Sequence, residues 1–391
     1  MKLKAIKFCR FSGQKYEWSM EGKPLHGTYK QCVTFQNINL IVGKNATGKS
    51  KTVNTIRHIA DLLAGNVKLS QLMYDTATYY LLFDNNGVEI KYTLDFQEGK
   101  IKTEILTVDG INRLDRDSEK GKMYYSAANT YLDFQMEEDK LAVSRIDNIQ
   151  QPFFEPLSTW GKNLSHYKFG GDLGKTTLLR DINAVKEDRE LDLKDTDQVT
   201  EIFVRGEKKF GKTFTAKIIE DMDKIAYKIT KIKVDSLKFF PIPAFGIGVQ
   251  EKDIDSITDQ KEMSQGMFRA LSLLVQLNYS LLSKIPSCIL IDDIGEGLDY
   301  ERSKKLIDLV IEKVKGSSVQ VIMTTNDRFV MNKIPLEYWS VIHRIAKKSL
   351  FYNYENSKEV FDDFKYTGLS NFDFLSSEFY FETLETQAEK I

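Results

Sequence analysis

Alternating and continuous runs of apolar residues divide this chain into predicted strands and helices. LKAIKFCRF (3–11) alternates apolar and polar positions, and FQNINLIVG (35–43) is an apolar run that ends at a glycine; both patterns predict strands. SKTVNTIRHIADLLAG (50–65) repeats apolar residues at helical spacing and reaches Gly65, which predicts a helix that stops there. Residues 78–108 read as antiparallel strands joined by turns at DNNG and QEGK.

A second strongly patterned region begins near Leu237. KEMSQGMFRALSLLVQLNYSLL (261–282) predicts a loop that enters an apolar helix, and YERSKKLIDLVIEKVKG (300–316) predicts an amphipathic helix. SCILIDD (287–293) and VQVIMTTND (319–327) are short apolar runs that end in polar residues. Apolar strands that alternate with helices favour a parallel α/β sheet covered on both faces.

These patterns suggest a division of the chain into four parts. The parts are an N-terminal lobe with antiparallel strands at 1–110, an insertion or arm region at 111–236, a C-terminal lobe at 237–354 and an aromatic tail at 355–391. We expect the tail to dock on the body, although a partner-binding tail is the alternative reading.

The insertion region has uneven charge. VKEDRELDLKDTDQ (185–198) is acidic and predicts a solvated helix or linker. Residues 205–238 hold ten Lys and Arg against five Asp and Glu. That bias indicates a solvated face, with a nucleic-acid site as the alternative.

Composition narrows the class of protein. The net charge is −1, with 42% apolar and 28% charged residues, so no global field draws the chain to nucleic acid or to a membrane. The three cysteines and four histidines are scattered, which argues against a disulfide frame or a metal site built from protein ligands alone. The sequence has neither a signal-peptide pattern nor an apolar stretch of membrane-spanning length, so we expect a cytoplasmic protein without a membrane partner.

Two segments match the phosphate-loop pattern of a glycine, four residues and Gly-Lys-Ser/Thr. GKNATGKS (43–50) follows a predicted apolar strand and precedes a predicted helix, as a phosphate-binding loop requires. GEKKFGKT (206–213) follows a short, half-charged segment and has bulky loop residues, so a second nucleotide site there is the weaker reading. GDLGKTT (171–177) is a near match, with two residues between its glycines where the pattern has four.

The first match supplies the candidate nucleotide-binding residues. Lys49 is expected to reach the β- and γ-phosphates, and the Ser50 hydroxyl to bind Mg²⁺. The full candidate set is Gly43, Lys44, Asn45, Ala46, Thr47, Gly48, Lys49, Ser50 and Lys51.

Carboxylates end the buried strand CILIDD. Asp292 is the candidate Mg²⁺ ligand, and Asp293 stands where a carboxylate would orient and deprotonate water against a γ-phosphate. Upstream, Ser264 and Gly266 lie where a loop enters an apolar helix, so a hydroxyl and free backbone amides could bind an anion. The acidic strand is followed by IGEGLD, which ends at Asp299.

The order GKNATGKS, MSQGMFRAL, CILIDD, EGLD and TTND, within 38–50 and 262–327, resembles ABC-type ATPases. The resemblance is to the non-transporter branch, with its SMC-like and RecF-like DNA-repair heads and OLD-like ATPases of bacterial phage defence. It implies a P-loop NTPase fold of ABC-ATPase type, in which a mixed sheet has helices on both faces, an antiparallel β lobe and a helical and β insertion.

The resemblance also implies ATP and Mg²⁺ as ligands and a homodimer or higher homo-oligomer with composite sites. The phosphate loop of one subunit would bind ATP, while Ser264 and Gly266 of another would cap its γ-phosphate. Asp299 would lie in the loop that crosses the interface. A glutamine that contacts Mg²⁺ is implied as well; Gln151 is our candidate, with Gln150 as the alternative.

Departures from the family pattern predict slow hydrolysis. The signature reads SQG and not SGG, and the catalytic position holds Asp293, which is one methylene shorter than the usual Glu. Glu296 could substitute for it. The family's switch histidine falls on Asn326, which can bind a phosphate but cannot become a cation near neutral pH.

We therefore expect an ATPase that converts ATP and water to ADP and phosphate and acts as a switch. The favoured role is the sensor or regulatory subunit of a bacterial anti-phage defence or toxin system, with a separate nuclease or toxin as effector. A DNA-repair ATPase that clamps nucleic acid is the alternative. A scaffold that binds ATP without hydrolysing it is a third possibility.

Overall fold

The computed structural model describes residues 1–23, 31–145, 147–185, 195–237, 243–284 and 287–381. The chain divides into two compact units. Unit 1 comprises residues 1–164 and 335–391, and unit 2 comprises residues 165–334. The four-part division expected from the sequence stays a prediction.

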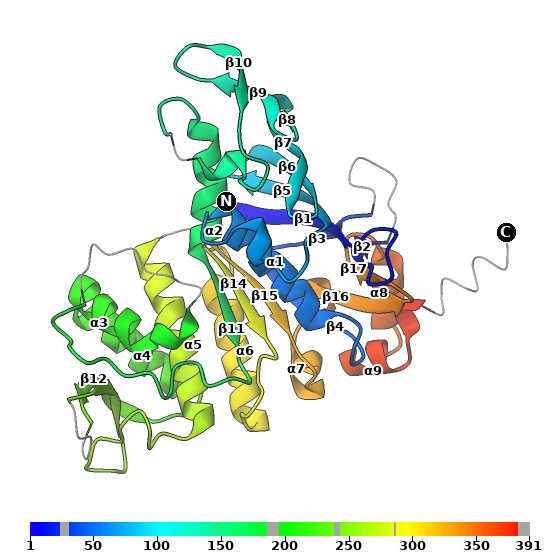
Figure 1. Ribbon diagram of the computed structural model, residues 1–391. Coiled ribbons are helices and arrows are strands. Elements are labelled where there is room, and N and C mark those ends of the chain that lie inside the picture. The colour runs from blue at the N-terminus through cyan, green and yellow to red at the C-terminus, as the bar shows by residue number, and fades with distance from the viewer. Residues whose placement is uncertain (24–30, 146, 186–194, 238–242, 285–286, 382–391) are drawn as a thin grey trace. The chain divides into compact units, whose positions relative to one another are not determined.

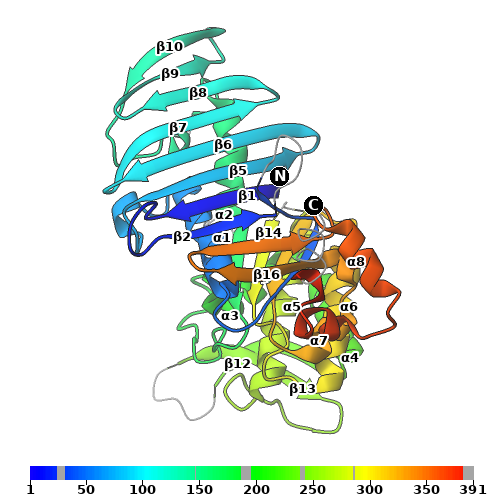
Figure 2. The ribbon, with the colours of Figure 1, turned by 90° about the vertical axis from the view of Figure 1, so that its right-hand side faces the viewer.

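Unit 1 contains a large mixed sheet (Figures 1 and 2). Its strands follow the order β10-β9-β8-β7-β6-β5-β1-β2-β17-β16-β4, and β3 pairs with β1. The strands are β1 Lys2–Arg10, β2 Trp18–Gly22, β3 Val33–Thr34, β4 Ile38–Val42, β5 Ala77–Asn85, β6 Val88–Gln97, β7 Lys100–Val108, β8 Ile111–Asp117, β9 Lys120–Tyr125, β10 Thr130–Gln135, β16 Trp339–Ile345 and β17 Lys348–Asn353. The helices of this unit are α1 Lys49–Leu63, α2 Glu155–Asn163, α8 Lys358–Lys365 and α9 Asn371–Ser376.

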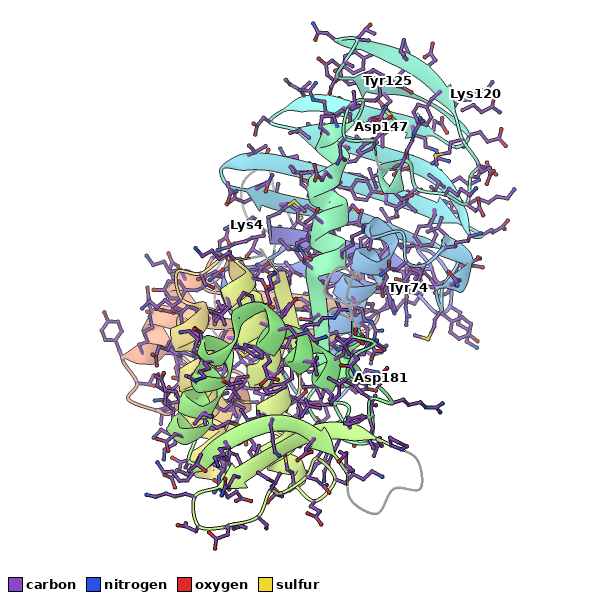
Figure 3. All side chains as sticks on the ribbon, turned by 90° about the vertical axis from the view of Figure 1, so that its left-hand side faces the viewer. Lys4, Tyr74, Lys120, Tyr125, Asp147 and Asp181 are labelled. Carbon is purple, nitrogen blue, oxygen red and sulfur yellow. The ribbon has the colours of Figure 1, made fainter. Side chains whose placement is uncertain are left out.

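Strands β5 to β10 form an antiparallel lobe in sequence order (Figure 2). Positive φ angles at Asn86 and Gly87, and at Glu98 and Gly99, close the two hairpins that the DNNG and QEGK turns predicted, as type I′ turns require. The antiparallel reading of 78–108 is confirmed. The lobe also extends through β8, β9 and β10, and Figure 3 labels Lys120 and Tyr125 at the two ends of β9.

The phosphate loop connects the fully buried strand β4 to helix α1. Strand β4 pairs in parallel with β16. In α1 the apolar stripe predicted by periodicity is buried, as Val53, Ile56 and Leu63 illustrate, and Gly65 with φ 75° follows the helix end. Strand, loop and helix therefore follow the order that the motif predicted.

The C-terminal aromatic residues dock on unit 1. Phe374 of α9 packs against Phe361 and Phe364 of α8, with ring centroids 4.6 and 5.0 Å apart. Tyr380 lies 5.5 Å from the Tyr352 ring on β17, and Phe381 stacks on His343 of β16. This confirms the docking expected for the tail up to residue 381.

Unit 2 contains a parallel strand pair, a helical group and a hairpin. The sheet order is β15-β14-β11, with β14 and β15 parallel, and β12 pairs with β13. The elements are β11 Leu164–Lys168, α3 Val199–Phe210, α4 Lys212–Lys224, β12 Ile229–Ser236, β13 Phe245–Glu251, α5 Gln265–Ser283, β14 Ser287–Asp292, α6 Tyr300–Val314, β15 Val319–Thr324 and α7 Arg328–Lys333. Helix, strand, helix and strand from α5 to β15 follow the predicted pattern.

The reading of residues 206–213 as a second phosphate loop is wrong. Gly206 to Phe210 belong to helix α3, and Lys212 and Thr213 begin helix α4. A Cβ on Gly206 would meet the Phe214 ring at 2.4 to 2.8 Å, so this glycine serves close helix packing. Backbone amides inside a helix are bonded to the preceding turn and cannot surround a phosphate. The acidic run at 185–198 falls mostly outside the described residues.

Candidate functional site

The glycines of the phosphate loop, Gly43 to Ser50, allow close backbone approaches. A Cβ on Gly43 would lie 2.7 Å from Thr47 Oγ1 and 2.9 Å from the Ile342 carbonyl oxygen. Gly48 has φ 120°, and a Cβ there would lie 2.8 Å from Ser349 Oγ. Both positions therefore need glycine for the loop to lie against strands β16 and β17.

Lys49 folds back into its own loop. Its buried Nζ donates to the Gly43 carbonyl at 2.7 Å and to the Lys44 carbonyl at 3.2 Å. Within α1, all of whose residues are described, the first turn has neither a capping side chain nor an acidic residue. A buried cation and a helix N-terminus at one loop form a site that favours an anion such as phosphate.

Further cations surround this loop. Burial lowers the pKa of Lys51, and the neighbouring Arg10 and Arg344 guanidinium groups lower it further. Arg344 Nη1 donates to the Ala46 carbonyl at 3.2 Å, and Lys51 Nζ lies 5.6 Å from the Trp18 ring centroid. Like charges at this proximity repel one another, so a bound polyanion would relieve their repulsion.

The exposed loop residue Lys44 forms an ion pair with Glu378 of the C-terminal segment. This pair lowers the pKa of Glu378, chiefly through the hydrogen bond from Lys44. Asn45 and Ala46 are exposed, and Ala46 adopts a left-handed φ of 63°. The Lys44 ammonium group is thus paired with a carboxylate that lies 334 residues away in the sequence.

Gln151 is buried with its side-chain amide unsatisfied. Its exposed fraction is 1%, and neither the amide nitrogen nor the amide oxygen has a hydrogen-bond partner among the described residues. Leaving a buried polar group unpaired costs about 1–3 kcal/mol, so the amide fits a site that a water or ligand completes. Gln150, the alternative, is partly exposed and its backbone amide donates to Asp147.

In unit 2, Thr324 at the end of β15 connects the two acids that follow β14. Its hydroxyl donates to Asp292 Oδ1 at 2.5 Å and accepts from the Asp293 backbone amide at 2.9 Å. Asp292 is therefore oriented by a neighbouring strand, as a metal-ligating carboxylate usually is. Thr324 was not expected at the site, although it is the first residue of TTND and the last residue of β15.

Asp293 and Asn326, the candidate catalytic residues, are brought together. Asn326 Nδ2 donates to Asp293 Oδ1 at 3.1 Å. Asp293 adopts a left-handed φ of 57°, which turns the chain sharply after Asp292 and is uncommon for residues other than glycine. Glu296, the possible substitute, has its carboxylate against Gly170.

Ser264, Gly266 and Asp299, the candidate residues of the opposite subunit, are neighbours in unit 2. Ser264 caps α5 by accepting from the Met267 amide at 3.2 Å. A Cβ on Gly266 would lie 2.8 Å from the Gly297 carbonyl oxygen, so the start of α5 touches the loop before α6. Asp299 caps α6 by accepting from the Arg302 amide at 2.9 Å.

Arg269 of α5 fastens this loop to its surroundings. Its guanidinium donates to the carbonyl oxygens of Glu296, Gly170 and Gly171. These contacts could not be expected from the sequence, because the carbonyl groups lie far from Arg269 along the chain.

Two features are absent from the part of the chain that the structure describes. Among the residues that the structure describes, no three His, Cys, Asp or Glu side chains gather to hold a metal ion. In the same part of the chain, no helix is long and apolar enough to cross a membrane.

Comparisons with known proteins identify a similar fold. No family model matches the sequence, and no curated protein matches it. Among solved structures, the SMC head bound to the C-terminal winged-helix domain of ScpA aligns over 90% of this chain and 97% of that chain, with 15% identity and a TM-score of 0.52. At that identity the likeness extends to the fold alone.

Two more solved structures are similar at lower scores. The SMC head domain from Thermotoga maritima aligns over 90% of this chain and 99% of that chain, with 13% identity and a TM-score of 0.47. An SMC head domain with an extended coiled coil, bound to the C-terminal domain of ScpA and derived from Pyrococcus furiosus, aligns over 93% and 99%, with 13% identity and a TM-score of 0.49. The fold of this chain resembles that of an SMC head, as the first comparison shows.

Proposed function

We propose that this protein binds ATP with Mg²⁺ and hydrolyses it slowly to ADP and phosphate. The observation that carries the proposal is Lys49, whose buried ammonium group rests on the Gly43 and Lys44 carbonyls at the uncapped start of α1. Phosphate oxygens are stronger acceptors for an ammonium group than neutral carbonyls are. The β- and γ-phosphates would therefore take over these hydrogen bonds.

The remaining roles follow from the chemistry of the side chains. Ser50 and Asp292 would hold Mg²⁺, which neutralises the charge on the β- and γ-phosphate oxygens. The unsatisfied amide of Gln151 fits a contact to the ion or its water. Asp293 would accept a proton from the attacking water, while Asn326 orients that carboxylate.

The geometry around Asp293 supports slow turnover. One of its oxygens already accepts from Asn326. The side chain is also one methylene shorter than glutamate, so its carboxylate would lie farther from the attacking water. Asn326 cannot supply the positive charge that a protonated histidine would bring to the developing phosphate. A switch that holds ATP for long periods is the expected behaviour.

Ser264, Gly266 and Asp299 support a composite site shared by two copies of the chain. They form one neighbourhood in unit 2, where the α5 start touches the loop before α6. In this proposal, they cap the γ-phosphate of ATP bound to a second copy. ATP binding would then close a homodimer, or a larger homo-oligomer, and hydrolysis would release it.

We further propose that this closure controls a separate effector, a nuclease or toxin, in a bacterial anti-phage defence or toxin system. Within the described residues, no acidic cluster beyond the ATPase motifs could bind metal for a nuclease of its own. The SMC-like fold favours the alternative that ATP closes the dimer on nucleic acid. A scaffold that holds ATP unhydrolysed is a third outcome of the tests.

The direct test follows molar mass and phosphate release with and without ATP and Mg²⁺. Wild type should form ATP-dependent dimers or larger assemblies and release phosphate slowly. Asp293→Ala should form them without releasing phosphate. Lys49→Ala should bind ATP about 10- to 100-fold more weakly, because it loses hydrogen bonds to a charged group.

Each contrary outcome has a separate meaning. Turnover as fast as that of vigorous transport ATPases would contradict the slow switch. An unchanged mass with ATP bound would contradict the composite site, and ATP-dependent assembly without phosphate release by wild type would favour the scaffold.

A further inference from the structure

Tyr227 and Arg302 adjoin the start of α5 in unit 2, and the sequence motifs include neither of them. Tyr227 follows the end of α4, where its amide donates to the Met222 carbonyl at 2.9 Å. Its hydroxyl oxygen lies 3.3 Å from where a Cβ on Gly266 would stand. The Ser264 side chain is near enough to lower the pKa of this hydroxyl. A phenol therefore lies beside the two residues of the signature.

The phenol is a proton donor near neutral pH. Burial raises the pKa of Tyr227; Arg302 lowers it to a smaller extent, the Asp299 charge raises it, and Ser264 lowers it least. The side chain is only partly buried, so a ligand arriving at Ser264 could reach its hydroxyl. A protonated phenol can donate one hydrogen bond to an anionic oxygen.

Arg302 holds the phenol in place. Its guanidinium carbon lies 4.4 Å from the Tyr227 ring centroid, within the range of a cation–π contact. The same guanidinium pairs with Asp299 at 2.5 Å and donates to the Ala226 carbonyl at 3.3 Å. One arginine thus joins the end of α4 to the start of α6, and the phenol lies between them.

We propose that the Tyr227 hydroxyl is an additional phosphate-binding donor of the signature surface, and that Arg302 is its positioning residue. The ligand is the terminal phosphate of ATP held by the phosphate loop of a second copy. This inference rests on the composite site proposed above. In this inference, three neighbouring donor groups bind the phosphate: the Ser264 hydroxyl, the first backbone amides of α5 and the Tyr227 phenol.

The geometry fits a terminal phosphate better than a neutral ligand. The first turn of α5, which is fully described, contains no acidic residue, so the positive end of the helix dipole faces the anion uncompensated. Asp299 adjoins this surface, and its charge is paired with Arg302. A phosphate with three exposed oxygens could accept from all three donor groups.

The test compares two mixtures of variants, and only the first mixture can form an intact composite site. Each protein carries a donor or an acceptor dye, and energy transfer reports mixed dimers in ATP and Mg²⁺. Lys49→Ala mixed with Tyr227→Phe retains one intact composite site. Wild type mixed with the double variant Lys49→Ala/Tyr227→Phe retains none, although the same substitutions are present in the mixture.

We expect the first mixture to dimerise about tenfold more tightly than the second. That difference corresponds to the loss of one hydrogen bond to a charged group. Tyr227→Phe keeps the ring on which Arg302 stacks, so folding should persist. Tyr366→Phe, at a side chain 89% exposed, is the matched control and should change nothing. Arg302→Ala should weaken ATP-driven dimers while ATP binding to single subunits stays unchanged.

Equal affinities in the two mixtures, with wild type still forming ATP-dependent dimers, would overturn the role of Tyr227 alone. Wild type that binds ATP without dimerising would overturn the composite site and this inference together. Weaker ATP binding by monomeric Tyr227→Phe would also overturn it, because the phenol would then act within its own subunit.

Discussion

At the scale of single residues, Trp18 is connected to the phosphate loop by two hydrogen bonds. Trp18 Nε1 donates to Ser349 Oγ at 3.0 Å, and that hydroxyl donates to the Thr47 carbonyl at 2.6 Å. Lys51 and Arg10 lie 5.6 and 5.8 Å from the indole ring. Any ligand that moves the loop or attracts these cations should change the surroundings of the indole.

This connection predicts an optical signal for nucleotide binding. ATP should change the intrinsic tryptophan fluorescence of wild type, and Trp18→Phe should abolish most of that change. Ser349→Ala keeps the indole but breaks the connection, so it should reduce the signal without removing tryptophan. A full response in Trp18→Phe would show that one of the other two tryptophans reports binding.

At the scale of secondary structure, a buried ion pair fastens the antiparallel lobe to the segment that follows it. Glu104 on β7 accepts from Arg116 Nη1 at 3.1 Å, from Ala142 N at 2.8 Å, and from Val143 N and the Tyr92 hydroxyl at 3.1 Å. Both charged side chains are fully buried. The carboxylate thus satisfies backbone amides of a loop and the guanidinium of β8 together.

Glu104→Ala should destabilise the protein by about 3–5 kcal/mol, because it leaves the buried Arg116 guanidinium without a counter-charge and two backbone amides without an acceptor. Denaturant unfolding followed by circular dichroism measures the loss. Glu137→Ala, which removes an exposed carboxylate paired with Lys140, is the control and should have little effect. A loss below about 1 kcal/mol for Glu104→Ala would mean that water replaces the carboxylate.

The local sequence pattern predicts some strands of the antiparallel lobe and not others. Hairpins β5–β7 were predictable because DNNG and QEGK place Asn-Gly and Glu-Gly where two positive φ angles are needed. Strands β8 to β10 were not, because a charged residue at a strand position gives no sign of facing inward. Arg116 shows this: a fully buried arginine on β8 looks like a surface residue in the sequence.

At the scale of the whole molecule, the charges of the basic stretch at 205–238 bear on whether the protein clamps nucleic acid or controls a separate effector. Several of its lysines are already paired with acids, Lys228 with Asp223 at 2.7 Å and Lys233 with Asp235 at 2.5 Å. Lys224 pairs with both Glu220 and Glu312. Such pairing leaves fewer cations to release counterions from a phosphate backbone.

We therefore expect only weak nucleic-acid binding. Fluorescence anisotropy with duplex DNA, at several salt concentrations and with ATP and Mg²⁺, should give dissociation constants no tighter than about 10⁻⁶ M near physiological salt. A much tighter complex that forms only with ATP and weakens steeply with salt would instead support the clamp.

The sequence by itself determined the parts of this protein whose chemistry is local. The phosphate loop, helix α1, the acidic end of β14 and the capped start of α5 each depend on residues within one turn or one strand-to-helix connection, so motif and periodicity were sufficient. Where a match lacked that context, as at residues 206–213, the helical structure overruled it.

Only the tertiary structure decided what surrounds these parts. Ser349 lies 302 residues from Thr47 in the sequence and bonds to it, Glu378 pairs with Lys44, and the Tyr227 phenol lies beside Ser264. Such contacts form because strands and helices distant in sequence are packed into one unit, and packing depends on the shapes of whole elements. A local pattern of hydrophobic and polar residues does not specify which distant side chain will contact a given residue.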